Sequence, residues 1–448
     1  MSAVQQPPLP PPEAVAPAAA VSELKPRGFG SRIERTPHAR STPAFLRQWN
    51  VILLVLVGAF AVVGSIAALV MQSASNTTAQ NTAPALIGVQ DLFASVAEAN
   101  AAATAAFLST SATGAEDRVN RNLYVDAIRR ASGQTEEVSA IIGDDEAAHL
   151  ALKDIGFALN TYSGQIEAAR VANANNLPNA DVQLRSGLAI VQEDVAASVA
   201  TVTERGQAQL EAERSTGQLL SLLAIGLGII TLLALLRVQI GLLQRTNRIL
   251  NPLLVVATLL IAAVLGYLVV GPSTRALALD SASTGGYDAI ITTSEIQSAA
   301  FDLQSSFSLE ILDGGSSPAD LAPLIDQVQA GIDEVRAGAD SDREVAAAET
   351  LAVRWQRYRD AVAAIDGEAL SGNQAAAVEL FQGEGLSAFN GLNTAVESVL
   401  SDNRSQFTDG VDRASRAVST TPFLTIILPV LAALAILLAI QRRLGEYR

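Results

Sequence analysis

The sequence predicts an all-α membrane protein with four transmembrane helices and two extracytoplasmic four-helix-bundle domains, internally duplicated. Four apolar segments without a charged residue occupy residues 49–71, 217–236, 252–271 and 422–440. Each is close to the roughly 20 residues that a helix needs to cross about 30 Å of hydrocarbon. Two long polar segments, residues 72–216 and 272–421, lie between the first and second spans and between the third and fourth.

The charge distribution predicts which side of the membrane each segment occupies. Residues 1–48, 237–251 and 441–448 together carry twelve basic and four acidic residues, although the whole chain has 30 basic and 45 acidic residues. Short basic segments remain in the cytoplasm. We therefore expect a multi-pass plasma-membrane protein with cytoplasmic N and C termini, a cytoplasmic loop at residues 237–251, and both acidic segments outside.

The basic segments also supply the expected inner contact surface. Its arginines are Arg237, Arg245, Arg248, Arg442 and Arg443. They would meet either a cytoplasmic partner or anionic lipid headgroups, and lipid anchoring is the simpler interpretation of any single one. The N-terminal tail, residues 1–48, begins with a disordered Pro-rich and Ala-rich stretch and then becomes basic. Within it, Thr36 and Thr42 precede prolines and are candidate phosphorylation sites, and a plain tether is the alternative.

Hydrophobic periodicity predicts that both polar segments are helical. Apolar residues recur at spacings of three and four, as in Val89, Leu92 and Val96 or in Trp355, Tyr358 and Val362. Breaks rich in Gly, Asp, Asn or Pro fall at residues 113–114, 143–145, 175–179, 313–318, 338–342 and 367–372. Short connections between long amphipathic helices favour an up-and-down four-helix bundle in each segment.

The halves of the chain align with each other. Tyr162 falls on Tyr358, and residues 184–199 run parallel to residues 380–396, which predicts an internal duplication. Residues 181–236 contain no proline, so we expect the last helix of the first bundle to continue unbroken into the second span. Asn251 before Pro252 is expected to cap the third span, and Thr420 and Thr421 offer a fresh start at the fourth.

The composition leaves little material for catalysis. The chain has no cysteine and only two histidines, His38 and His149, so disulfides, thiolate sites and histidine-based metal sites are not expected. We predict no enzyme activity, no metal, no cofactor and no nucleic-acid partner. The spans carry no charged residue, which makes transport a weaker alternative. An envelope scaffold or adaptor without signalling is the other alternative.

Three arginines flank an aromatic seam in the second polar segment. Arg354, Arg357 and Arg359 surround Trp355 and Tyr358. Guanidinium groups bind carboxylates in bidentate fashion, so these arginines are candidates for contact with a ligand or partner. The more common arrangement is pairing with neighbouring acidic residues on a solvated helix face.

The plan resembles the four-helix-bundle sensor modules of chemoreceptors and histidine kinases, here present twice. The likeness rests on the Trp355, Tyr358 and Val362 seam and on the apolar stripe at residues 386–399. The whole chain is also similar to the actinobacterial GlnX family of four-span membrane proteins, through Phe45, Trp49 and the short arginine-rich loop.

The resemblance implies a function. It implies an extracytoplasmic amino-acid-binding lipoprotein of the GlnH type as one partner and the cytoplasmic Ser/Thr protein kinase G as the other. The chain would then be a non-enzymatic transmembrane signal transducer that relays aspartate or glutamate availability. The expected loop of about 15 residues and the short tail hold no output domain, so output would pass to another protein.

Overall fold

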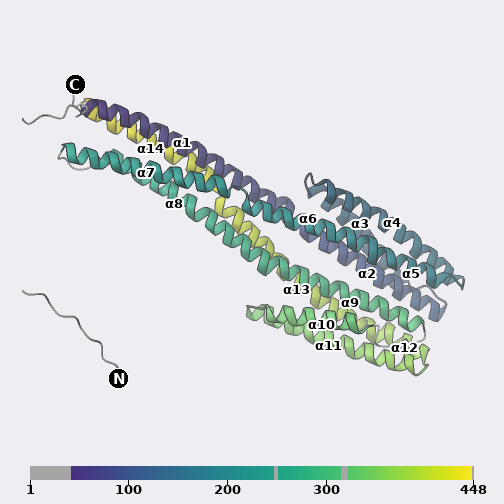
Figure 1. Ribbon diagram of the computed structural model, residues 1–448. Coiled ribbons are helices and arrows are strands. Elements are labelled where there is room, and N and C mark those ends of the chain that lie inside the picture. Colours follow the sequence, from purple (N-terminus) through teal and green to yellow (C-terminus); the bar gives the residue numbers. More distant parts are fainter. Residues whose placement is uncertain (1–41, 247–250, 314–320, 446–448) are drawn as a thin grey trace, which may run out of the picture.

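The computed structural model describes residues 42–246, 251–313 and 321–445, and these residues contain helices and no strand. Figure 1 shows an elongated molecule with the apolar helices at one end and two helical groups at the other. Within these described residues, four helices are long and apolar enough to cross a membrane. The predicted all-α class with four apolar spans is confirmed.

In the first half, residues 42–246 form nine elements in order. They are α1 (Thr42–Thr77), the π-helical turn η1 (Thr78–Thr82), α2 (Ala83–Thr113), α3 (Arg118–Ile141), α4 (Glu146–Ala174), α5 (Ala180–Ile190), the π-helical turn η2 (Val191–Val195), α6 (Ala196–Ser215) and α7 (Gln218–Thr246).

The second half repeats this order of elements, including the π-helical turns. It contains α8 (Pro252–Ser281), η3 (Ala282–Tyr287), α9 (Asp288–Leu312), α10 (Ala322–Ala337), α11 (Asp342–Leu370), α12 (Gln374–Leu380), η4 (Phe381–Gly385), α13 (Leu386–Ser419) and α14 (Thr421–Gly445). A shared order of this kind is what an internal duplication predicts.

Local sequence signals explain where several helices begin. The side chains of Asp117 and Asp145 accept hydrogen bonds from the first turns of α3 and α4. Ser341 and Glu344 form a reciprocal capping box at the start of α11. Asn251 caps α8 as predicted, by accepting a bond from the backbone N–H of Leu253. The caps Asp145 and Ser341 lie within the predicted breaks at 143–145 and 338–342, and α3 begins shortly after the break at 113–114.

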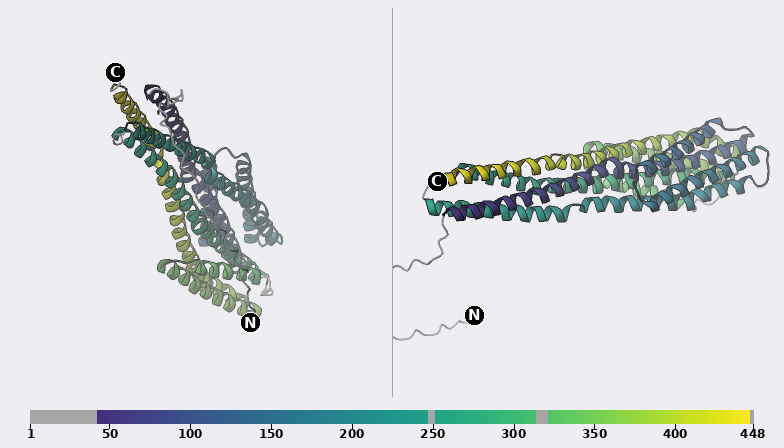
Figure 2. Two further views of the ribbon diagram at one scale, coloured as in Figure 1. Left: turned by 60° about the vertical axis from the view of Figure 1, so that its left-hand side comes forward. Right: turned by 90° about the horizontal axis from the view of Figure 1, so that it is seen from above.

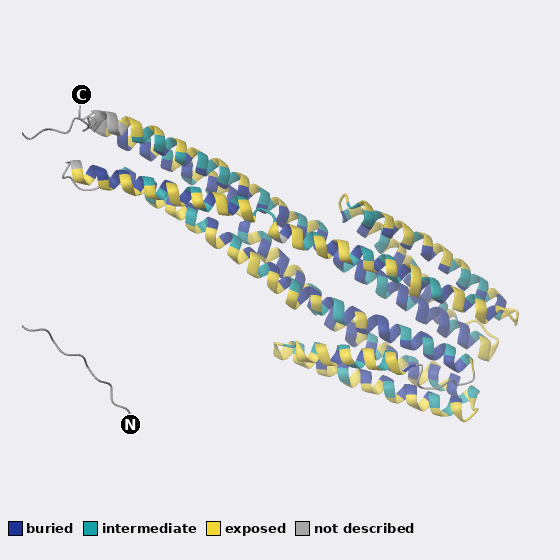
Figure 3. Cartoon of the chain, viewed as in Figure 1, coloured by how far each residue is buried: buried dark blue, intermediate teal, exposed yellow. Residues whose placement is uncertain are grey.

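The four apolar helices form one bundle in which α1 and α8 each contact both α7 and α14. Its core includes Leu53, Phe60 and Ile261, all less than 2% exposed. Leu222 and Leu259 point outward and are more than 60% exposed. Figure 3 shows buried and exposed residues alternating along these helices. Apolar side chains on the outer face are suited to contact with lipid tails.

The two helical groups away from the spans meet along α2 and α9. Ala97, Ala101 and Ala105 of α2 belong to the same buried cluster as Ile296 and Ala300 of α9. Small residues allow two helix backbones to approach closely. Both views in Figure 2 place these groups at the end of the molecule opposite the C-terminus.

The predicted unbroken run through residues 181–236 is wrong. Helix α6 ends at Ser215, Thr216 is extended, and Gly217 has a φ of 83° before α7 begins. Glycine is suited to this left-handed conformation because it has no Cβ, and a Cβ here would lie 2.7 Å from Cγ of Met71. The first helix of each half is unbroken, Arg47–Thr113 and Pro252–Leu312, and the last helix of the second half, Gln374–Arg442, departs from helical assignment only at Thr420, which keeps right-handed helical φ and ψ.

The predicted alignment of the halves is also wrong in its last part. If Tyr162 is aligned with Tyr358 without gaps, Val191 is aligned with Ser387. In the structure, Val191 begins the π-helical turn η2, and its counterpart in the second half, η4, begins at Phe381. The second half is shorter here because α12 has 7 residues where α5 has 11.

Candidate functional site

The three arginines predicted to contact a ligand do not converge. Arg354 is exposed and lies beside Gly391 of α13. Arg357 is exposed, whereas Arg359 is partly buried and lines a groove between α9, α10 and α11 with Asp366. The structure therefore distributes these guanidinium groups over different sides of α11.

The aromatic seam between those arginines belongs to the core. Trp355 and Tyr358 are each 1% exposed. Trp355 Nε1 donates to Gln329 Oε1 at 3.0 Å, and the Tyr358 hydroxyl donates to Gln304 Oε1 at 2.6 Å. Burial raises the pKa of Tyr358. These side chains hold α11 against its neighbours.

The predicted inner surface is described only in part. Arg237 on α7 and Arg442 on α14 are exposed. The side chains of Arg245, Arg443 and Thr42 are outside the description, and Arg248 and Thr36 lie outside the described residues.

Near the C-terminal end of α7, a buried glutamine that the sequence analysis missed ties two spans together. Gln239 Nε2 donates to the backbone oxygen of Leu254 at 3.0 Å and to Thr258 Oγ1 at 2.7 Å. This amide fixes α7 against α8 beside the connecting loop.

A buried polar cluster lies just beyond the predicted outer ends of the spans. We call it the junction cluster, and it comprises Ser75, Thr78, Thr82, Gln209, Glu213 and Arg275. Its members come from α1 and η1, from α6, and from α8. It therefore joins elements of both halves.

Glu213 is the acceptor at the centre of the junction cluster. Its carboxylate accepts hydrogen bonds from Thr78 Oγ1 at 2.5 Å, Thr82 Oγ1 at 3.0 Å and Gln209 Nε2 at 3.0 Å. Thr78 and Thr82 are spaced by one helical turn, so both hydroxyls face the same carboxylate. These bonds hold α6 against η1 directly before the break at Thr216.

Arg275 supplies the link to the second half. It is 3% exposed, and its Nε donates to Ser75 Oγ at 2.6 Å while Nη2 donates to the backbone oxygen of Glu213 at 2.9 Å. Burial lowers the pKa of Arg275, and the charge of Glu213 opposes that effect. A buried cation is costly unless its partners stay in place, so this geometry favours one register of α8 against α1.

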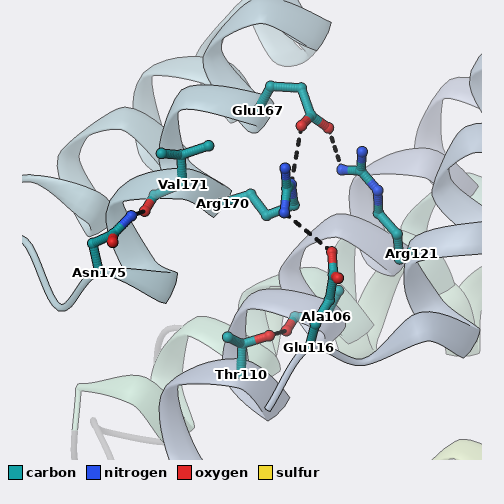
Figure 4. Close-up of polar contacts among 8 residues, drawn as sticks. All are labelled: Ala106, Thr110, Glu116, Arg121, Glu167, Arg170, Val171 and Asn175. Carbon is teal, nitrogen blue, oxygen red and sulfur yellow. Dashed lines mark hydrogen bonds and ion pairs between the residues drawn. The ribbon is translucent and has the colours of Figure 1, made fainter. Parts of the chain in front are cut away.

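A second network closes the end of the first helical group that is remote from the spans. Figure 4 shows Glu167 of α4 between Arg121 and Arg170, and Arg170 reaching Glu116 at 3.1 Å. Burial alone would raise the pKa of Glu167, but the hydrogen bonds from Arg121 and Arg170 lower it. The adjoining cavity is about 30 Å³, room for about one water molecule. We interpret this network as a clamp on the helix ends.

The arrangement positions helices and offers little for catalysis. Across residues 42–246, 251–313 and 321–445, no three His, Asp or Glu side chains gather in a way that could hold a metal ion. The junction cluster instead couples the relative position of α1, α6 and α8 to a set of buried hydrogen bonds.

Comparison with known proteins identifies a sensor relationship for the first helical group. Residues 74–215 match the family model of the actinobacterial sensor domain. The chain shows no match to a curated protein or to a solved structure. The matched region includes Thr78, Thr82 and Glu213, and ends where α6 ends. Together with the four apolar helices, the match supports a membrane protein with a sensing role.

Proposed function

We propose that the chain is a non-enzymatic transmembrane signal transducer. Both helical groups lie outside the membrane, and the basic loop and both termini lie in the cytoplasm. An extracytoplasmic amino-acid-binding lipoprotein reports aspartate or glutamate availability to the helical groups, and a cytoplasmic Ser/Thr protein kinase receives the output. The match of residues 74–215 to a sensor domain supports the sensing part of this proposal.

The observation that carries the proposal is the continuity of the first helix of each half. The helix Arg47–Thr113 has 67 residues, which corresponds to roughly 100 Å at 1.5 Å per residue. Pro252–Leu312 is similarly continuous through α8 and α9. A stiff helix that passes from a helical group into a span transmits a shift or rotation across the membrane.

The relay path therefore differs from the one that the sequence predicts. The last helix of the first group was expected to run unbroken into the second span, but the break at Thr216 and Gly217 interrupts it. We assign transmission to α1–α2 and α8–α9. The junction cluster fixes the two paths relative to each other through Arg275 and Ser75.

A kinase-output assay tests the relay. In cells that produce the chain, its binding lipoprotein and the kinase, added aspartate should change phosphorylation of a kinase substrate, and deletion of the chain should abolish the change. Arg275→Met should reduce the response, whereas Arg129→Met on exposed α3 should not. An unchanged response in the deletion strain, with altered cell shape, would favour a scaffold instead.

A labelling assay tests the orientation independently. Because the chain contains no native cysteine, Thr350→Cys on α11 and Gln244→Cys on α7 each introduce one exposed thiol. An impermeant maleimide on intact cells should label the cysteine at position 350 and spare the one at position 244. The reverse pattern would contradict the orientation and with it the relay.

A further inference from the structure

The outer face of α4 carries an apolar stripe that no described part of the chain covers. Leu150, Phe157, Gly164 and Val171 recur every seven residues, and all four are exposed. Phe157 is 74% exposed, and a Cβ added at Gly164 would meet no atom within 4 Å. The opposite face of α4 belongs to the core of the first helical group. A seven-residue repeat holds one stripe against a partner helix along its length, as in a coiled coil.

Two opposite charges flank this stripe. Lys153 and Asp154 are exposed, and among the described residues neither forms an ion pair. With 3.6 residues per turn, they lie about 50° to either side of the line from Leu150 to Phe157. Adjacent residues of a helix do not face each other, so these two charges cannot pair within one chain.

A second copy of the chain would bring these charges together. Two copies in one membrane have the same orientation, because each carries its four apolar helices at one end. Their α4 helices would therefore run parallel, related by a two-fold axis along the helices. The side that bears Lys153 on one helix then faces the side that bears Asp154 on the other, at heights that differ by about 1.5 Å. Leu150 and Phe157 meet their own counterparts about one turn away on either side.

The corresponding helix of the second half lacks this self-complementary pattern. Helices α4 and α11 both have 29 residues, so their positions can be matched from their first residues, Glu146 and Asp342. Leu150, Lys153, Asp154 and Phe157 then correspond to Ala346, Glu349, Thr350 and Val353. The basic member is replaced by an acid, so two α11 helices would gain no opposite charges across a two-fold axis.

We propose that the α4 face, formed by Leu150, Lys153, Asp154, Phe157 and Gly164, is the contact surface between two copies of the chain in one membrane. Two Lys153–Asp154 pairs surround the axis, with apolar layers above and below them. Figure 1 shows α4 on the side of the first group that faces away from α9–α13, so each copy keeps its own contact between α2 and α9. This surface is independent of the proposed lipoprotein and kinase.

Disulfide trapping of the full chain in isolated membranes tests the contact. Gly164→Cys places one thiol on the stripe of a chain that has no native cysteine. A parallel α4 pair would bring the two thiols within reach of a disulfide, which needs Cα atoms about 4.4–6.8 Å apart. Oxidation with copper phenanthroline should give a covalent dimer that contains both of two differently tagged copies. Asp360→Cys, the exposed counterpart on α11, should stay monomeric.

Charge exchange in the Gly164→Cys chain identifies the pairs. Lys153→Asp and Asp154→Lys should each lower the dimer yield severalfold, because like charges then face each other. The two changes together should restore the yield, since each copy again offers one charge of each sign. Phe157→Ser should also lower the yield, whereas Val353→Ser on α11 should not.

Three results would overturn the proposed α4 contact. They are the absence of a covalent dimer from Gly164→Cys, an equal yield from Asp360→Cys, and failure of the double charge exchange to restore the dimer. A product of Gly164→Cys with a different protein would assign the α4 face to that protein and would equally contradict the proposal. No lipoprotein or kinase takes part in the assay, so its outcome is separate from that of the relay.

Discussion

Replacement of Arg275 by Met should loosen the junction between the two halves. The change keeps a long side chain but removes the donors to Ser75 Oγ and to the backbone oxygen of Glu213. It also removes the positive charge that interacts with the Glu213 carboxylate, which is 9% exposed. Breaking one side of a buried charged arrangement costs about 3–5 kcal/mol. We expect a local loss of about 3 kcal/mol.

Native-state hydrogen exchange measures this loss where it occurs. A cost of about 3 kcal/mol corresponds to roughly 100-fold faster amide exchange if the segment exchanges by local opening. The affected residues should be 72–82 and 272–281, with little change in α3 and α4. Glu213→Gln added to Arg275→Met should recover about 1–2 kcal/mol, because contacting residues couple.

Two outcomes would refute the reasoning about the junction cluster. One is unchanged exchange at residues 72–82 and 272–281 in the Arg275→Met protein. The other is strict additivity of Arg275→Met and Glu213→Gln, which would mean that the two side chains do not interact. Arg129→Met is the matched control, since an exposed surface pair is worth about 0–1 kcal/mol.

Two further predictions concern packing and pH. Gly286→Ala should destabilise the chain by about 1–3 kcal/mol, since its Cβ would lie 2.8 Å from Cα of Phe407, whereas Gly285→Ala meets open space and should be tolerated in the same thermal-melt assay. Burial raises the pKa of Asp302 to about 6 from 3.8, so its stabilising proton is fully present below about pH 4 and lost as pH rises through about 6. Asp302→Asn should therefore stabilise the chain at pH 7.5 by roughly 2–3 kcal/mol and have little effect at pH 4. Asp326 is exposed, so Asp326→Asn should leave the stability unchanged at both pH values. Equal melting shifts for Asp302→Asn at both pH values would contradict this assignment.

The features that the sequence predicts well are those set by neighbouring residues. The apolar spans can be located from composition alone. The N-terminal starts of α3, α4 and α11 are set by the capping residues Asp117, Asp145 and Ser341. Each of these signals acts within a few residues of the element that it determines. The helical class and most helix boundaries follow from such local signals.

The junction cluster depends on residues that are distant in the chain. Ser75, Glu213 and Arg275 come from three different helices. In the sequence alone, Ser75 is a small polar residue beyond a span, Glu213 is one of many acidic residues, and Arg275 is a basic residue near a membrane surface. The one available signal was Arg275, a base four residues beyond an apolar span on the side predicted to be outside. Only packing shows that it is buried.

The break in the last helix of the first group has a similar cause. Gly217 is the first residue of an apolar span and follows a helical pattern without proline, so the sequence predicts continuation. The structure places it against Met71, where a Cβ would be too close. Tertiary contact with α1 thus sets the conformation that local propensity leaves open.

The most direct test of the relay measures motion at the ends of α1 and α8 that lie away from the two helical groups. Val51 and Val256 are exposed, and the chain has no native cysteine, so Val51→Cys and Val256→Cys can each carry one spin label. Pulsed electron paramagnetic resonance in nanodiscs then reports the distance between the two labels. Adding the aspartate-loaded binding lipoprotein should shift the distance distribution, and Arg275→Met should weaken the shift. An unchanged distribution while the lipoprotein is demonstrably bound would contradict transmission through these helices.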